Sequence, residues 1–103
     1  MIKVSVLYEN TPGQKFDMAY YMSKHIPLVK QKLGAACKRV EIDQGLAGVQ
    51  SGSKPRFIAQ ANFLFDSVEA FQQAFAPHAQ AIMADIPNYT TLEPIIQLNE
   101  VKL

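Results

Sequence analysis

The chain has 103 residues, a formal net charge of +1, and 49% hydrophobic and 18% charged residues. This length predicts one domain over residues 1–103 with a modest core, and the composition is that of a globular rather than a disordered protein. The near-neutral charge argues against a nucleic-acid partner, and no apolar run approaches the roughly 20 residues of a membrane span.

The first elements in chain order are a strand and an amphipathic helix. Residues 2–9 alternate between two faces, which predicts a strand. A helix is predicted over 16–34 because apolar residues recur at helical spacing: Met18, Met22, Ile26, Val29 and Leu33. Tyr21 and His25 lie four residues apart beside this stripe, so they should be neighbours. Pro27 has no N–H, so the helix should bend or break near His25 unless a fresh helical segment begins after Pro27.

The remaining elements are predicted from alternation and from turn residues. Strands are predicted over 37–44, 56–65 and 93–101, and the Gly- and Ser-rich residues 45–55 should form a loop. A second helix should begin at Asp66, as its N-cap with Glu69 three residues later, be interrupted at Pro77 and run to Ile86. The order predicts an α+β, ferredoxin-like βαββαβ fold, a four-stranded antiparallel sheet with both helices on one face.

The two faces of this predicted sheet differ in polarity. One face should form the core under the helices: Val4, Val6, Val40, Ile42, Ala59, Ala61, Phe63, Ile96 and Leu98. The other is mixed, and includes Ser5, Leu7, Glu41, Ile58, Gln60, Asn62, Leu64, Ile95, Gln97, Asn99 and Val101. Such a face is too apolar to remain in water, so a homodimer that packs sheet against sheet is expected. Polar residues enclosed in it would line a cavity for a small hydrophobic ligand.

Three segments together resemble the EthD family. They are Tyr21-x-x-x-His25-x-Pro27-Leu28, the helix start Phe65-Asp66-Ser67-x-Glu69-Ala70-Phe71, and Ile86-Pro87-Asn88-Tyr89-Thr90 followed by Glu93-Pro94. The resemblance runs from Ile2 to Val101 and implies a dimeric α/β barrel, with a pocket between sheet and helices or in the lumen. The family is associated with ethyl tert-butyl ether breakdown. Its superfamily includes cofactor-free monooxygenases, polyketide cyclases and lactone isomerases, so the resemblance implies the fold more firmly than the reaction.

His25 is the candidate catalytic residue. An imidazole with a pKa near 6.5 exchanges protons at neutral pH, and Tyr21 could orient it or share the proton. The resemblance also points to His25, because the histidine of the His-x-Pro step matches a hallmark of the family. The alternative is a structural histidine that binds a backbone carbonyl freed by Pro27.

Other polar residues are candidates for ligand binding. Ser5, Gln60 and Asn62, with Gln97, could polarise a ligand carbonyl, or could only form cross-strand hydrogen bonds. Tyr8 and Tyr89 could close the mouth of a pocket, or could only pack half-buried. His78 is expected to be a surface or capping residue.

Neither a metal site nor a cofactor is expected. The two histidines lack ligand spacing, and residues 45–52 lead into a strand, unlike a phosphate-binding loop. Cys37 is expected to be an ordinary thiol. The single cysteine and the lack of a signal peptide favour a cytoplasmic protein.

Three functions remain open from the sequence. The first is a small cofactor-independent isomerase, cyclase, decarboxylase or monooxygenase, which acts on a hydrophobic carbonyl- or phenol-bearing molecule with His25 as acid or base. The second is a non-catalytic dimer that binds or carries a hydrophobic metabolite. The third is a structural dimer with a filled lumen.

Overall fold

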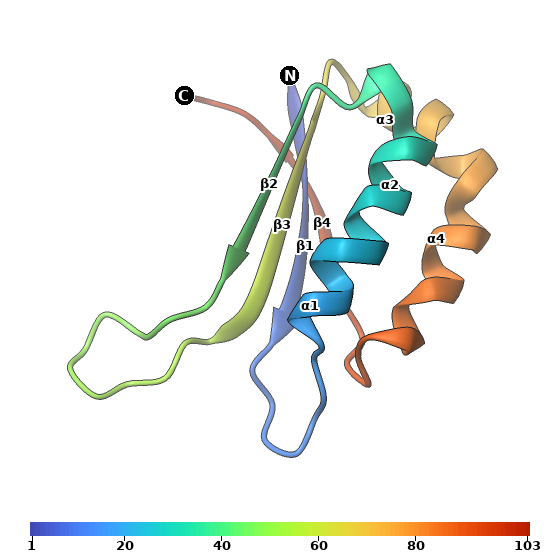
Figure 1. Cartoon of the computed structure of the whole chain (residues 1–103). Coiled ribbons are helices and arrows are strands. Elements are labelled where there is room, and N and C mark those ends of the chain that lie inside the picture. Colours follow the sequence, from blue (N-terminus) through green and yellow to red (C-terminus); the bar gives the residue numbers. More distant parts are fainter.

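A computed structural model describes all 103 residues and confirms the ferredoxin-like α+β fold (Figure 1). The four strands are β1 (Ile2–Glu9), β2 (Arg39–Gln44), β3 (Phe57–Phe65) and β4 (Ile95–Glu100). They form one antiparallel sheet in the order β2-β3-β1-β4. The helical segments pack in a second layer on one face of this sheet, and the other face is left open.

The register of the sheet explains which strand residues are buried. Val4 lies opposite Phe63 on one side and opposite Leu98 on the other, so these side chains share the helix-facing side. Along β3 burial alternates with each residue, and the buried positions are Ala59, Ala61, Phe63 and Phe65. The predicted separation into a core face and a mixed face is therefore confirmed for the two central strands.

The helix-facing side of β4 differs from the prediction. Ile96 and Leu98 were expected in the core, but they are 45% and 42% exposed. The reason is topological, because β4 is an edge strand with a neighbour only in β1. The sequence pattern of an edge strand and of a covered strand is the same, so the alternation could not show this difference.

The first helical segment is continuous through Pro27. It comprises α1 (Met18–Tyr20), a π-helical turn (Tyr21–His25), α2 (Ile26–Leu33) and a 3₁₀ turn (Gly34–Ala36). In the π turn the carbonyl of Tyr21 accepts from the N–H of Ile26, five residues on. Pro27 lies in the first turn of α2, where a missing N–H is tolerated. Gly34 ends α2 with a φ of 64°, which favours glycine.

The π turn also shifts the buried face of this helix. Met22, expected on the apolar stripe, is 46% exposed, whereas Tyr21 and His25 are buried with Ile26, Val29 and Leu33. A π turn holds one extra residue, so apolar positions before and after it no longer share one helical phase. The prediction of Met22 as a core residue is therefore wrong, and His25 lies deeper in the core than the stripe suggested.

The second helical segment consists of α3 (Val68–Phe75), a 3₁₀ turn (Ala76–His78) that contains Pro77, α4 (Ala79–Asp85) and a 3₁₀ turn (Ile86–Asn88). Its N-cap is Ser67 and not Asp66 as predicted, since the Ser67 hydroxyl accepts from the N–H of Ala70 at 3.0 Å. β3 continues to Phe65, which displaces the cap by one residue. The Asp66 carboxylate lies instead 3.9 Å from the ammonium of Lys38.

No helix combines the length and the apolar character that a membrane span requires.

Candidate functional site

His25 and Asp85 form a hydrogen-bonded pair at the centre of the helical layer. Nδ1 of His25 lies 2.9 Å from Oδ2 of Asp85, and their side chains are 6% and 15% exposed. His25 comes from the π turn and Asp85 ends α4, so the pair joins the two helical segments. The predicted alternative, a histidine bound to a backbone carbonyl near Pro27, is not what the structure shows.

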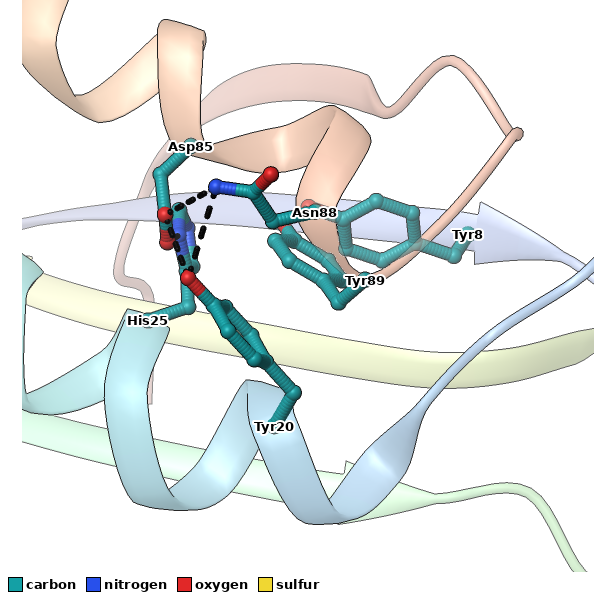
Figure 2. Close-up of polar contacts among 6 residues, drawn as sticks. All are labelled: Tyr8, Tyr20, His25, Asp85, Asn88 and Tyr89. Atoms are coloured by element: carbon teal, nitrogen blue, oxygen red, sulfur yellow. Dashed lines mark hydrogen bonds and ion pairs between the residues drawn. The ribbon is translucent and has the colours of Figure 1, made fainter.

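The carboxylate of Asp85 accepts three hydrogen bonds from different side chains (Figure 2). Tyr20 donates its hydroxyl to Oδ1 at 2.8 Å, and Asn88 donates its amide to the same oxygen at 3.0 Å. The imidazole of His25 occupies the other oxygen. Because every donor acts on the charged form of the carboxylate, the network favours an ionised Asp85.

The pKa shifts agree with a neutral imidazole beside a charged carboxylate. Burial lowers the pKa of His25 below its usual value, although the hydrogen bond and the charge of Asp85 oppose this shift. Burial tends to raise the pKa of Asp85, but hydrogen bonds from Asn88, His25 and Tyr20 leave it below its usual value. An ionised carboxylate can only accept, so Nδ1 of a neutral His25 must carry the proton and Nε2 must carry the lone pair.

Nε2 of His25 makes no hydrogen bond within the protein. Nδ1 is the only ring nitrogen with a partner, yet no fully buried side-chain nitrogen or oxygen lacks one. Nε2 is therefore not fully buried, and His25 is one of the residues that line a cavity between the sheet and the helices.

Aromatic rings enclose the imidazole. Tyr21 stacks on His25 with ring centroids 5.7 Å apart and an interplanar angle of 16°, and Tyr89 lies 4.6 Å from it. The predicted contact between Tyr21 and His25 is thus confirmed as ring stacking, while the orienting hydrogen bond comes from Asp85. These rings keep water from one side of His25, which explains the lowered pKa.

The cavity between the sheet and the helices has a volume of about 90 Å³. Of its 17 lining residues, only Tyr8, Tyr21 and His25 carry a polar nitrogen or oxygen in the side chain. Two others, Met83 and Ile96, are 42% and 45% exposed, so the cavity reaches the surface between α4 and β4. Its walls suit an apolar molecule with one or a few polar atoms.

Tyr8 and Tyr89 lie inside the protein rather than at a pocket mouth. They are 1% and 0% exposed, and their hydroxyl oxygens are 2.6 Å apart. Tyr89 is held there by its own backbone, because its carbonyl accepts from the N–H of Asp17 at 2.7 Å. A β-bridge between Phe16 and Thr90 also joins the segment before α1 to the segment that contains Tyr89.

The predicted binding residues of the sheet lie on the opposite face from His25. Ser5 donates to Asn62 at 2.7 Å, Asn99 donates to Ser5 at 3.0 Å, and Gln97 donates to Asn99 at 2.6 Å. Gln60 pairs with Leu7 of β1 on this same open face. The sheet therefore separates Ser5, Gln60 and Asn62 from the cavity that His25 lines.

The remaining candidates from the sequence, Cys37 and His78, do not belong to this site. Burial raises the pKa of the Cys37 thiol, which agrees with the predicted ordinary cysteine. His78 lies half-buried in the 3₁₀ turn before α4 and outside the cavity. No cluster of three or more His, Cys, Asp or Glu side chains is arranged to hold a metal ion.

Sequence reasoning missed Tyr20, Asp85 and Asn88. The available signal was Asp85 itself, a carboxylate directly before the buried Ile86 at the end of an apolar helix. Only the packing of two helical segments shows that this carboxylate faces His25, 60 residues earlier in the chain.

Comparison with known proteins agrees on one family. The model of the EthD domain matches residues 13–93. An uncharacterised 11.0 kDa protein from the thcB–thcC intergenic region of Rhodococcus erythropolis is 32% identical over an alignment of 96 residues, and the match covers 88% of this chain and 85% of that protein.

Similar solved structures share the fold. An EthD-like protein from Ralstonia eutropha JMP134 is 45% identical, with a TM-score of 0.94 over 99% of this chain and 92% of that one. A dimeric ferredoxin-like protein of unknown function from Thermobifida fusca YX is 12% identical, with a TM-score of 0.58 over 97% and 90% of the two chains. The second likeness supports the fold alone.

Proposed function

Because the chain belongs to the EthD family, we propose that it is a small cofactor-independent enzyme that uses His25 as a general base. Its substrate is a hydrophobic carbonyl- or phenol-bearing molecule held in the cavity between sheet and helices. One observation carries this proposal: His25 lines an apolar cavity, and Asp85 holds the proton on its Nδ1 while its Nε2 has no partner within the protein.

The geometry supports proton abstraction near neutral pH. The lowered pKa keeps His25 unprotonated and ready to accept a proton, and Asp85 stabilises the imidazolium once it forms. Isomerisation, cyclisation and cofactor-free oxygenation of carbonyl or phenol compounds each begin with such a deprotonation. The apolar walls exclude water, which strengthens the electrostatic effect of Asp85.

The proposal includes a homodimer formed through the open face of the sheet. On the open face, β4 carries the apolar side chain of Ile95, which is 42% exposed and lies beside Leu7 of β1. Leu46 and Val49 of the β2–β3 loop are 91% and 106% exposed. Apolar surface of this kind is typical of a protein interface, and the similar Thermobifida fusca protein is described as dimeric.

The test is exchange of the α-protons of cyclopentanone for deuterium, followed by ¹H NMR in D₂O. This ketone is small, apolar and enolisable. The wild type should accelerate exchange over buffer, and His25→Gln should lose about 10²- to 10⁴-fold, the usual contribution of a general base. His78→Gln is the matched control, because the other histidine lies outside the cavity.

The outcomes separate an enzyme from a carrier. If the ketone binds but the wild type never exceeds the buffer rate, the protein is a carrier for hydrophobic metabolites. If His25→Gln and His78→Gln exchange equally fast, His25 is not the base.

A further inference from the structure

The two oxygens of the Asp85 carboxylate have different partners. Tyr20 and Asn88 both donate to Oδ1, at 2.8 Å and 3.0 Å, while Nδ1 of His25 lies 2.9 Å from Oδ2. Asn88 also donates to the hydroxyl of Tyr20 at 3.4 Å, which closes a triangle around Oδ1 (Figure 2). Tyr20 and Asn88 therefore bind the oxygen that His25 does not use.

The π turn explains how one helical segment brings both Tyr20 and His25 to this carboxylate. In a regular α-helix, two residues five positions apart point about 140° away from each other around the helix axis. The π turn over Tyr21–His25 begins directly after Tyr20 and contains a hydrogen bond across five residues. This wider turn leaves Tyr20 and His25 on one side of the helix, where both contact Asp85. Such π turns are frequent at functional sites.

The Asp85 carboxylate needs partners on both oxygens to keep one orientation. The terminal torsion of an aspartate is broad and roughly two-fold, so hydrogen bonds rather than a rotamer preference fix the plane of the carboxylate. The side chain of Asp85 is 15% exposed, so water can compete with His25 for Oδ2. The two bonds to Oδ1 hold the carboxylate in the plane in which Oδ2 meets Nδ1.

The ring of Tyr20 is held in place independently of its hydroxyl. It stacks on the ring of Tyr89, with centroids 6.2 Å apart and an interplanar angle of 19°. Tyr89 is buried and lies 4.6 Å from the imidazole of His25. The hydrogen bond to Asp85 raises the pKa of Tyr20, so the hydroxyl remains a donor at neutral pH. Tyr20 is thus a fixed donor, and loss of its hydroxyl alone leaves the stacked ring in place.

We propose that Tyr20 and Asn88 are positioning residues for His25: by binding Oδ1 of Asp85 they keep Oδ2 on Nδ1, and so keep the proton on Nδ1 and the lone pair on Nε2. The proposal rests on the proposed function for its catalytic consequence, but the tautomer of His25 is measured without any substrate. Neither Tyr20 nor Asn88 lines the cavity, so both act through Asp85. Tyr20 has the greater effect, because its bond is shorter and joins two helical segments, whereas Asn88 is three residues from Asp85 in the same segment.

The test follows the Nδ1–H of His25 by NMR in the protein without a ligand. Tyr20→Phe removes one hydroxyl and keeps the stacked ring, and Asn88→Ala removes an exposed amide. In Tyr20→Phe this hydrogen should exchange with water about 3- to 10-fold faster, because a hydrogen bond to a charged group is lost. The ¹⁵N shifts should show a second population of His25 with the proton on Nε2. Asn88→Ala should have a smaller effect in the same direction, and the double variant the largest.

Thr91→Val is the matched control. The Thr91 hydroxyl accepts from the N–H of Lys15 at 3.0 Å and donates to Gln14 at 2.7 Å, so it also joins the chain around α1 to the chain after α4 without contacting Asp85. Its exchange rate and tautomer should equal those of the wild type. Equal acceleration in Thr91→Val and Tyr20→Phe would show a general loosening and overturn the positioning role. A Tyr20→Phe spectrum identical to that of the wild type would also overturn it. If Tyr20→Phe does not fold, Asn88→Ala decides, and an unchanged exchange rate there overturns the proposal.

Failure of this inference is distinguishable from failure of the proposed function. Faster Nδ1–H exchange in Tyr20→Phe supports the positioning role even if the wild type never exchanges the protons of cyclopentanone. If the wild type does exchange them, Tyr20→Phe should lower kcat about 3- to 10-fold with an unchanged KM, because Tyr20 lies outside the cavity. A raised KM with an unchanged kcat would place Tyr20 in ligand binding and overturn the positioning role.

Discussion

Nδ1 of His25 and Oδ2 of Asp85 lie 2.9 Å apart, although the two residues are 60 positions apart in the chain. The π turn brings His25 to the buried side of the first helical segment, and α4 ends at Asp85 so that its carboxylate meets the ring. This single contact determines which imidazole nitrogen is protonated and which is basic.

Replacing Asp85 with Asn should change the tautomer of His25. Asparagine keeps the shape but can donate as well as accept, so both neutral tautomers become populated. The ¹⁵N NMR spectrum of His25 should show an unprotonated Nε2 in the wild type and averaged signals in Asp85→Asn. Any His25-dependent activity should fall on the order of 10³- to 10⁴-fold, as expected when a base loses its orienting carboxylate. Asp66→Asn, at an exposed carboxylate, is the control, and identical ¹⁵N shifts in all three proteins would contradict the role of Asp85.

The lowered pKa of His25 predicts a loss of stability in mild acid. Between the folded-state pKa and 6.5, the unfolded chain binds more protons than the folded one, so stability is complete above pH 6.5 and falls as the pH drops toward the folded value. Urea unfolding of the wild type from pH 7.5 to 4.5 should show this decline, and His25→Gln should flatten it. His78→Gln should retain the wild-type slope. Equal slopes in the wild type and His25→Gln would show that burial does not shift His25.

The N-cap of α3 is a test of local structure. Ser67→Ala removes the hydrogen bond to the N–H of Ala70 and should lower the free energy of unfolding by about 1 kcal/mol, within the range of roughly 0.5–2 kcal/mol for such caps. Asp66→Ala is the neighbouring control. It should have little effect, because an exposed ion pair contributes roughly 0–1 kcal/mol. Thermal or urea unfolding measures the stability of both variants. A larger loss of stability in Asp66→Ala than in Ser67→Ala would show that Asp66 is the N-cap.

The open face of the sheet predicts the assembly state. Ile95 is 42% exposed on this face, so a lysine there should place charges in the sheet-to-sheet interface and yield a monomer by light scattering after size exclusion. Met22→Lys is the matched control, because Met22 is 46% exposed on the helical layer and should leave the dimer intact. A dimer that persists in Ile95→Lys would place the interface elsewhere.

The sequence predicted every strand of the sheet, because alternation along β1 and β3 reports directly which side of a strand is buried. It also predicted the contact between Tyr21 and His25, which depends only on helical spacing. It did not predict the exposure of Met22, because an apolar stripe assumes one helical phase and the π turn at Tyr21–His25 shifts that phase. It misplaced the N-cap by one residue, because Asp66 and Ser67 are both good caps and the end of β3 selects between them.

The order of residues was enough to predict the fold and the candidate histidine. Both depend on patterns within a few residues of the chain, which are hydrophobic periodicity, turn residues and the Tyr21–His25 spacing. The arrangement of the site emerged only in the folded chain, where Asp85 orients His25, the hydroxyl of Tyr21 has no hydrogen-bond partner, and Asn62 lies across the sheet from the cavity. Hydrogen-bond geometry and burial arise where distant segments pack, and the order of residues along the chain does not contain those distances.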